Sequence, residues 1–92
     1  MSVPTVDEIK TESALLAEMK PTVRKTSMFG DNHHDAIDGQ VTVLDGRLTD
    51  SQIYDEFEDG PHNVLEAALE ARRWLDGEED GKPSDDWEEL VQ

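Results

Sequence analysis

Apolar residues recur along this chain in runs with the spacing of amphipathic helices. The first run starts at Thr5 and Glu8, which form a Thr-x-x-Glu capping box, and stops before Pro21. Ser13 and Lys20 interrupt the apolar stripe, so we expect a helix whose first turns are loosely held. The apolar positions are Ile9, Leu15, Leu16 and Met19. Residues 21–30 then read as an extended connector between a proline and a glycine, with Arg24 and Lys25 as a small basic cluster that balances nearby acids.

Residues 31–48 allow two interpretations. The segment VTVL before Asp45-Gly46 is typical of a β-hairpin with a type I′ turn. Alternatively, Asp31 caps a helix that ends with Gly46 as its C′ residue. The apolar residues that would face the core of such a helix recur at i, i+4 and i+7, namely Ile37, Val41 and Leu44.

The element that follows favours the helix. Thr49 and Gln52 form a second capping box, and Leu48 and Ile53 stand at the positions of a hydrophobic staple. If a helix begins at Thr49, only two residues remain for a returning strand, which is too short to pair. The short helix continues through Tyr54 and Phe57 towards Gly60.

Residues 61–76 contain the strongest helix pattern. Pro61 opens it, Gly77 closes it, and its apolar residues occupy most of its circumference: Val64, Leu65, Ala68, Leu69, Ala71, Trp74 and Leu75. Ser84 is placed to cap a last short helix, DDWEELV. The sequence therefore predicts an all-α fold, a small bundle of four to five helices around residues 61–76. Residues 1–92 form a single domain, with residues 1–8 and 77–92 as its flexible ends.

The net charge changes this picture most. The chain carries 23 Asp and Glu against eight Lys and Arg, for a net charge of −15 and a pI near 4.2. Such a surplus disfavours direct binding of nucleic acid, because affinity for a phosphate backbone comes from Lys and Arg. It favours instead a basic protein partner, or solubility alone as in halophilic proteins. With no cysteine, no signal-peptide pattern and no long apolar run, we expect a cytoplasmic protein that does not enter membranes.

No arrangement of residues indicates catalysis. The chain has no cysteine nucleophile, no glycine-rich phosphate loop and no Ser and His in a recognisable context, so we predict a protein that is not an enzyme and needs no cofactor. His34 and Asp38 have the i, i+4 spacing that could place two metal ligands on one helix face. A polar helix N-terminus explains His33, His34 and the acids around them better, and no metal site is predicted.

The acids are concentrated in two clusters. YDEFEDG places four acids around two aromatic residues, and residues 76–92 hold eight acids against Lys82 alone, a net charge of −7. Acids three or four residues apart on a helix lie about 5–6 Å from each other, a spacing on the scale of the phosphates along a nucleic-acid strand, about 3.4 Å apart. The predicted partner-binding residues are Asp55, Glu56, Glu58, Asp59, Asp76, Glu78, Glu79, Asp80, Asp85, Asp86, Trp87, Glu88 and Glu89.

Trp87 is included because a solvating acidic tail has no need of large apolar groups. With Leu90 and Val91 it forms a short amphipathic stripe. This stripe either packs on Trp74 and the central helix, which we favour, or projects as an acidic, hydrophobic peptide that anchors in the groove of a partner.

Four segments together give the chain a resemblance to known proteins: SMFGDNHHDAIDGQ, IYDEFEDG, NVLEAALEARRWLDGE and DDWEELV. Across residues 27–91 it resembles a group of small acidic proteins carried by bacteriophages and plasmids. The group has no diagnostic catalytic motif, so the resemblance assigns no residue a role. It implies an origin in a mobile element, where small acidic proteins often inhibit host nucleic-acid enzymes, as anti-restriction and anti-CRISPR proteins do.

These observations predict a non-enzymatic inhibitor. Its acidic clusters would mimic nucleic acid and block a basic nucleic-acid-binding surface of a host defence or DNA-processing protein, with Tyr54 or Trp87 supplying the lasting contact. The alternative is an adaptor that binds another protein through a helical groove and the acidic, hydrophobic C-terminal segment.

Overall fold

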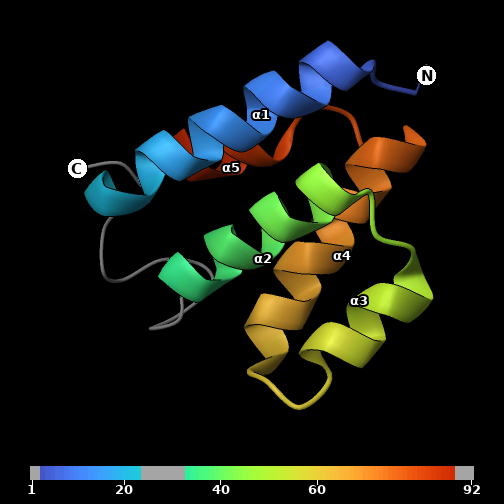
Figure 1. Cartoon of the computed structure of the whole chain (residues 1–92). Coiled ribbons are helices and arrows are strands. Elements are labelled where there is room, and N and C mark those ends of the chain that lie inside the picture. The colour runs from blue at the N-terminus through green and yellow to red at the C-terminus, as the bar shows by residue number, and fades with distance from the viewer. Residues whose placement is uncertain (1–2, 24–32, 89–92) are drawn as a thin grey trace.

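The computed structural model describes residues 3–23 and 33–88, which are drawn in colour in Figure 1. Within these ranges the chain forms α1 (Val6–Met19), a short 3-10 helix η1 (Lys20–Thr22), α2 (His33–Gly46), α3 (Asp50–Phe57), α4 (His62–Asp76) and α5 (Pro83–Glu88), and no strand. The predicted all-α bundle is confirmed. Asp31, Arg24, Lys25, Glu89 and the last residues of the predicted C-terminal stripe lie outside the described residues.

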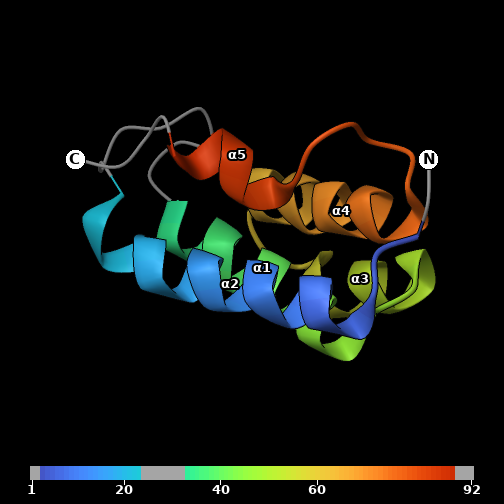
Figure 2. The ribbon, with the colours of Figure 1, turned by 90° about the horizontal axis from the view of Figure 1, so that it is seen from above.

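Two helices form the centre of the bundle. α2 and α4 make the most extensive contact, α1 packs on α2 and α5, and α3 packs on α4 (Figure 1). In the view turned by 90° (Figure 2), α5 lies next to both α1 and α4, with which it makes contacts. α4 is therefore central as predicted, and it shares that place with α2. Among the described residues, no helix combines the length and apolar character that crossing a bilayer requires.

The ambiguous segment is a helix, and it contributes much of the core. Ala36, Ile37, Val43 and Leu44 are fully buried, and so is the polar Gln40. Val41, which the pattern assigned to the core stripe, is only half-buried. Gln40 and Val43 occupy the positions between Ile37 and Leu44, so the buried face is rotated from the predicted one.

α1 shows a similar shift. Glu12 and Ser13 are buried together with Ile9 and Leu16, whereas Leu15 is 42% exposed. Ser13 therefore belongs to the buried face that it was expected to interrupt. The core accepts the carboxylate of Glu12 because this group has a hydrogen-bond partner from another helix, described below.

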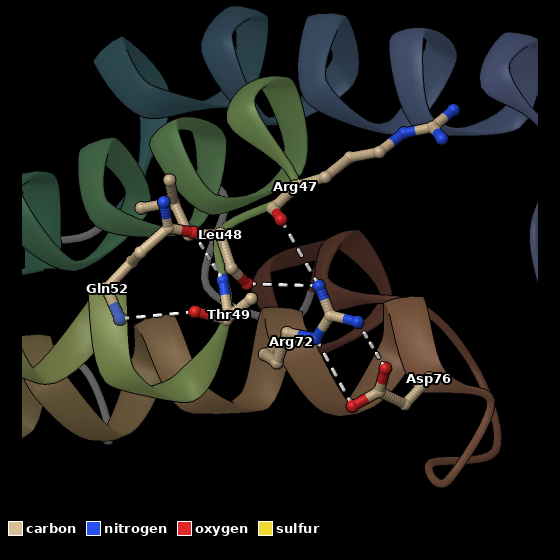
Figure 3. Close-up of polar contacts among 6 residues, drawn as sticks. All are labelled: Arg47, Leu48, Thr49, Gln52, Arg72 and Asp76. Carbon is tan, nitrogen blue, oxygen red and sulfur yellow. Dashed lines mark hydrogen bonds and ion pairs between the residues drawn. The ribbon is translucent and has the colours of Figure 1, made fainter.

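The starts of the helices follow the predicted capping patterns with small displacements. Thr49 Oγ1 accepts from the Gln52 backbone N–H at 3.3 Å, and Gln52 Oε1 accepts from the Thr49 N–H at 2.9 Å, which completes the capping box before α3 (Figure 3). Thr5 Oγ1 accepts from the Glu8 N–H at 3.2 Å. Pro61 precedes the first residue of α4 instead of opening it, and Ser84 lies inside α5, after Pro83.

The ends of α2 and α4 share one geometry. Gly77 ends α4 with φ 75°, and Glu78 N–H donates to Arg73 O at 2.9 Å, a Schellman arrangement. At the end of α2 the residue with positive φ is Arg47 (φ 48°), not the predicted Gly46, and Leu48 N–H donates to Val43 O at 3.2 Å. The sequence thus places its glycine one residue before the position that needs it.

Replacing Arg47 by glycine is expected to stabilise the protein by about 0.5–1 kcal/mol. A left-handed conformation costs an L-residue about 1–2 kcal/mol, of which the greater flexibility of unfolded glycine takes back part. The Arg47 carbonyl, which accepts from Arg72, is kept. Urea denaturation measures the change. Asp45→Gly, inside the helix, is the matched control and should destabilise by about 1 kcal/mol; equal destabilisation by both variants would contradict this account.

Candidate partner-binding surface

The α3 end of the acidic surface and the first part of the C-terminal acidic segment lie at opposite ends of α4, whereas the rest of that segment lies on α5. The first, called here the α3 cluster, consists of Asp55, Glu56, Glu58 and Asp59 and precedes α4. The second, the C-terminal cluster, consists of Asp76, Glu78, Glu79 and Asp80 at and after the end of α4 and of Asp85, Asp86 and Glu88 on α5. In Figure 1 the loop before α4 lies at the bottom and the loop after it at the upper right. Since α4 has 15 residues, the α3 cluster is separated by about 22 Å, at 1.5 Å per residue, from the acids that follow α4. The acids on α5 lie closer to the middle of α4, where Asp86 meets Glu70.

All four side chains of the α3 cluster are exposed. Within residues 3–23 and 33–88, none of them takes part in an ion pair. The charge of this cluster is therefore directed to solvent, as the sequence predicted.

The C-terminal cluster is less uniform. Asp76 is bound by Arg72, and Glu79 Oε1 lies 3.8 Å from Arg73 Nη1. Asp85 Oδ2 accepts from the Lys82 backbone N–H at 3.0 Å, so it caps the start of α5. Asp86 is half-buried, and the remaining described acids, Glu78, Asp80 and Glu88, are exposed. This cluster therefore offers fewer unpaired charges than its composition suggests.

Trp87 does not belong to the exposed surface. Its side chain is fully buried, and its indole N–H donates to Gln40 Oε1 on α2. Gln40 Nε2 in turn donates to Ala67 O on α4 at 3.1 Å. Of the two alternatives for Trp87, the packed one is observed, with Gln40 as the polar partner. A projecting Trp87 anchor is excluded in this arrangement.

A second buried contact fixes the same helix. The Ser84 backbone N–H in the first turn of α5 donates to Glu12 Oε1 on α1 at 2.5 Å. Glu12 thus satisfies one of the backbone donors that a helix start leaves without an internal partner. Together, Glu12 and Gln40 hold α5 against α1 and α2, and so determine where the acids around it lie.

Arg72 on α4 positions α3. Its guanidinium donates to Arg47 O at 3.3 Å and to Leu48 O at 3.0 Å, and it forms a two-pronged contact with Asp76 (Figure 3). The hydrogen bonds that Arg72 donates to Asp76 raise the pKa of Arg72 and outweigh the opposing effect of its partial burial. Because the connector bound by Arg72 leads directly into the capped start of α3, this contact fixes the α3 cluster relative to α4.

Glu70 on α4 and Asp86 on α5 form a pair of carboxyl groups. Burial, followed by the hydrogen bond and negative charge of Asp86, raises the pKa of Glu70 to about 8, and Arg73 opposes this only weakly. Glu70 is therefore mostly protonated at neutral pH, which lets the two carboxyl groups share a hydrogen bond. No pattern in the sequence pointed to this pair, because the two residues lie on different helices.

A hollow between α3 and α4 carries the exposed aromatic residue. Tyr54 is 47% exposed, and it lines this hollow together with the half-buried Leu65 and Leu69. The sequence indicated such a surface because apolar residues occupy most of the circumference of α4, more than the neighbouring helices bury. Of the two aromatic anchors considered from sequence, only Tyr54 is available for contact.

Asp38, one of the two residues with the spacing of metal ligands, forms an ion pair. Both carboxylate oxygens of Asp38 accept from Lys20 Nζ at 2.7 Å, which ties α2 to η1. Among the residues that the structure describes, no three His, Asp or Glu side chains are arranged to hold a metal ion.

Comparison with known proteins adds no functional assignment. No family model, no curated protein and no solved structure matches this chain. The function is therefore inferred from the chain's own residues.

Proposed function

We propose that this protein is a non-enzymatic inhibitor that binds a basic nucleic-acid-binding surface of a host defence or DNA-processing protein and excludes nucleic acid from it. The proposal includes an origin in a mobile element and a role of the anti-restriction or anti-CRISPR type. The observation that carries it is the exposed α3 cluster before α4, together with the exposed acids of the C-terminal cluster that follow α4.

The separation of the clusters suits an extended basic surface. A span of about 22 Å corresponds to six or seven phosphates along one strand, at about 3.4 Å each. Because exposed charges are screened beyond about 8 Å at physiological salt, the two clusters act nearly independently. Each should therefore make its own contribution to binding, and the contributions should add.

The acids of the α3 cluster are suited to long-range attraction. They have no ion-pair partner among the described residues, so a basic partner need not displace an internal cation to reach them. Attraction between opposite charges speeds encounter and favours basic partners over others, while lasting affinity comes from a buried anchor.

The test is displacement of labelled duplex DNA from a panel that includes a restriction endonuclease and an RNA-guided nuclease. The wild-type protein should displace DNA from at least one member, and raising the salt concentration should weaken its binding. Asp55→Asn, Glu56→Gln, Glu58→Gln and Asp59→Asn combined should weaken inhibition about 30-fold, if each exposed charge contributes about 0.5 kcal/mol.

A matched control separates position from net charge. The combined variant of Asp7→Asn, Glu8→Gln, Glu18→Gln and Asp45→Asn removes the same charge from α1 and α2, all at exposed positions. It should retain inhibition within about threefold. Equal loss in both variants would show that only total charge matters, and no loss in either would refute the proposed role of the acids.

A further inference from the structure

α5 is the shortest α-helix among the described residues, and its place depends on contacts with other helices. It has six residues and packs mainly on α1, with a smaller contact on α4. The Ser84 backbone N–H donates to Glu12 Oε1 on α1. The Trp87 indole donates to Gln40 Oε1 on α2. A helix this short has little stability of its own in water, so it remains a helix only while these contacts hold it.

The connector between α4 and α5 has two points of easy rotation. Gly77 (φ 75°) and Gly81 (φ 89°) are the two glycines with positive φ among the described residues. Glycine populates positive and negative φ about equally, so the backbone can rotate there at little cost. The connector therefore lets α5 move as a unit while α4 stays in place.

The contact between α5 and α4 contains two carboxyl groups. Asp86 shares a hydrogen bond with Glu70, beside a cavity of about 100 Å³ that Trp74 also lines. Two carboxyl groups can share a hydrogen bond only while one of them holds a proton, and two carboxylates in the same place repel each other. With the proton the pair joins α5 to α4, and without it the pair pushes the two helices apart.

The charged groups around Glu70 do not compensate for a lost proton. Glu79 in the connector adds negative charge, and Arg73 on α4 opposes both acids with the smallest effect of the groups that act on Glu70. Towards α3, His62 and Glu66 pair with each other. The other charged residues that line the cavity are Asp80, Lys82 and Asp85. The surroundings of the carboxyl pair therefore keep α5 closed only while the pair holds its proton.

We propose that α5 is a pH-sensitive latch, closed while the Glu70–Asp86 pair holds a proton and released about the glycine connector when that proton is lost. This inference goes beyond the proposed function, because it describes a second state of the chain. Release removes Trp87 from the core together with the acids of α5 and exposes the acidic, hydrophobic segment that the closed state buries. Glu12, whose carboxyl group is buried in the closed state, regains water, which lowers the cost of opening.

The pKa of Glu70 determines the pH range in which the latch works. Burial and Asp86 raise this pKa from 4.5 to about 8 in the closed state. The closed state is therefore fully stabilised by the proton below pH 4.5 and loses that stabilisation as pH rises through about 8. An opening equilibrium governed by these two pKa values alone would change about 50-fold from pH 6 to pH 8, and solvent screening reduces the expected change to about tenfold.

Single cysteines test the latch, because the chain has none of its own. Ser84→Cys places a thiol in α5, and Ala68→Cys places one near the middle of α4, both at buried positions. Each rate of labelling by N-ethylmaleimide is divided by that of an unstructured cysteine peptide at the same pH. The Ser84→Cys protein should be labelled at least tenfold faster than the Ala68→Cys protein from pH 6 to pH 8, and its normalised rate should rise about tenfold over this range.

Two further variants identify the group that titrates. Glu70→Gln, combined with Ser84→Cys, should remove most of the rise, because glutamine keeps a hydrogen-bond donor and cannot ionise. Glu12→Gln in the same background is the matched control, since it replaces another carboxyl group in contact with α5 and keeps an acceptor for the Ser84 N–H. The rise should persist in this control. A rise that persists in Glu70→Gln, or that disappears in Glu12→Gln, would overturn the proposal.

Hydrogen exchange of the unmodified protein gives the same comparison without a substitution in the core. The hydrogen bond to Gln40 protects the Trp87 indole N–H while α5 is closed, whereas the Ala68 amide lies within α4. After correction for intrinsic exchange rates, the indole proton should be at least tenfold less protected than the Ala68 amide. Equal protection of the two protons from pH 6 to pH 8 would show that α5 opens only with the whole domain, and would refute the latch.

Discussion

Replacing Trp87 by alanine is expected to destabilise the protein by about 3–5 kcal/mol, the cost of emptying a large, fully buried aromatic site. The loss leaves Gln40 Oε1 without its indole donor inside the core, which adds to the effect. For a domain of this size, such a change lowers Tm by more than about 12 °C.

Thermal denaturation followed by circular dichroism measures this effect. Tyr54→Ala is the control, because an exposed aromatic residue should cost less than about 1 kcal/mol. The two variants thus separate an aromatic residue of the core from one of the surface. Similar stability losses in both, or a Trp87→Ala protein as stable as the wild type, would contradict the placement of α5.

Stability is also expected to fall as pH rises from about 4.5 to about 8. Burial and Asp86 raise the pKa of Glu70 from 4.5 to about 8 in the folded protein, so the folded state holds a proton that the unfolded state has released. The stabilisation of the folded state by this proton is fully present below pH 4.5 and is lost as pH rises through about 8. Allowing for solvent screening of a half-buried group, the loss is about 1–2 kcal/mol.

Urea denaturation across this pH range measures the slope. Glu70→Gln keeps a hydrogen-bond donor but cannot ionise, so it should remove this part of the slope and stabilise the protein at pH 9. Glu66→Gln, one turn away and exposed, should leave the slope nearly unchanged near pH 8. A slope retained in Glu70→Gln would assign the effect to other groups.

The local signals in the sequence predicted most of the fold. The capping box at Thr49 and Gln52 fixed the start of α3, and its position excluded the hairpin before it. Gly77 ended α4 where expected. These features are determined by residues a few positions apart, which is why sequence alone reveals them.

The sequence did not reveal the buried polar contacts. Glu12 meets Ser84 across 72 positions, and Gln40 meets Trp87 across 47. From sequence alone, Glu12 and Gln40 are expected at the surface, because the groups that hydrogen-bond to them come from helices far away in the chain. Because these contacts bury Glu12 and Gln40, the buried faces of α1 and α2 are rotated from the predicted ones.

The candidate surface was predicted in part. The exposure of the α3 cluster followed from its polarity, whereas the burial of Trp87 and the pairing of Asp86 with Glu70 depend on where α5 packs. Tyr54 shared the aromatic character of Trp87 in the sequence, and only the packing of α5 against α1 and α2, and of α3 against α4, distinguishes them.

The proposed mimicry is tested most directly by competition on one partner. For a nuclease from which the protein displaces DNA, the apparent Kd for labelled duplex is measured at increasing concentrations of the inhibitor. Mutually exclusive binding predicts an apparent Kd that rises in proportion to inhibitor concentration without limit. A plateau, showing that DNA and inhibitor bind together, would contradict occupation of the nucleic-acid-binding surface.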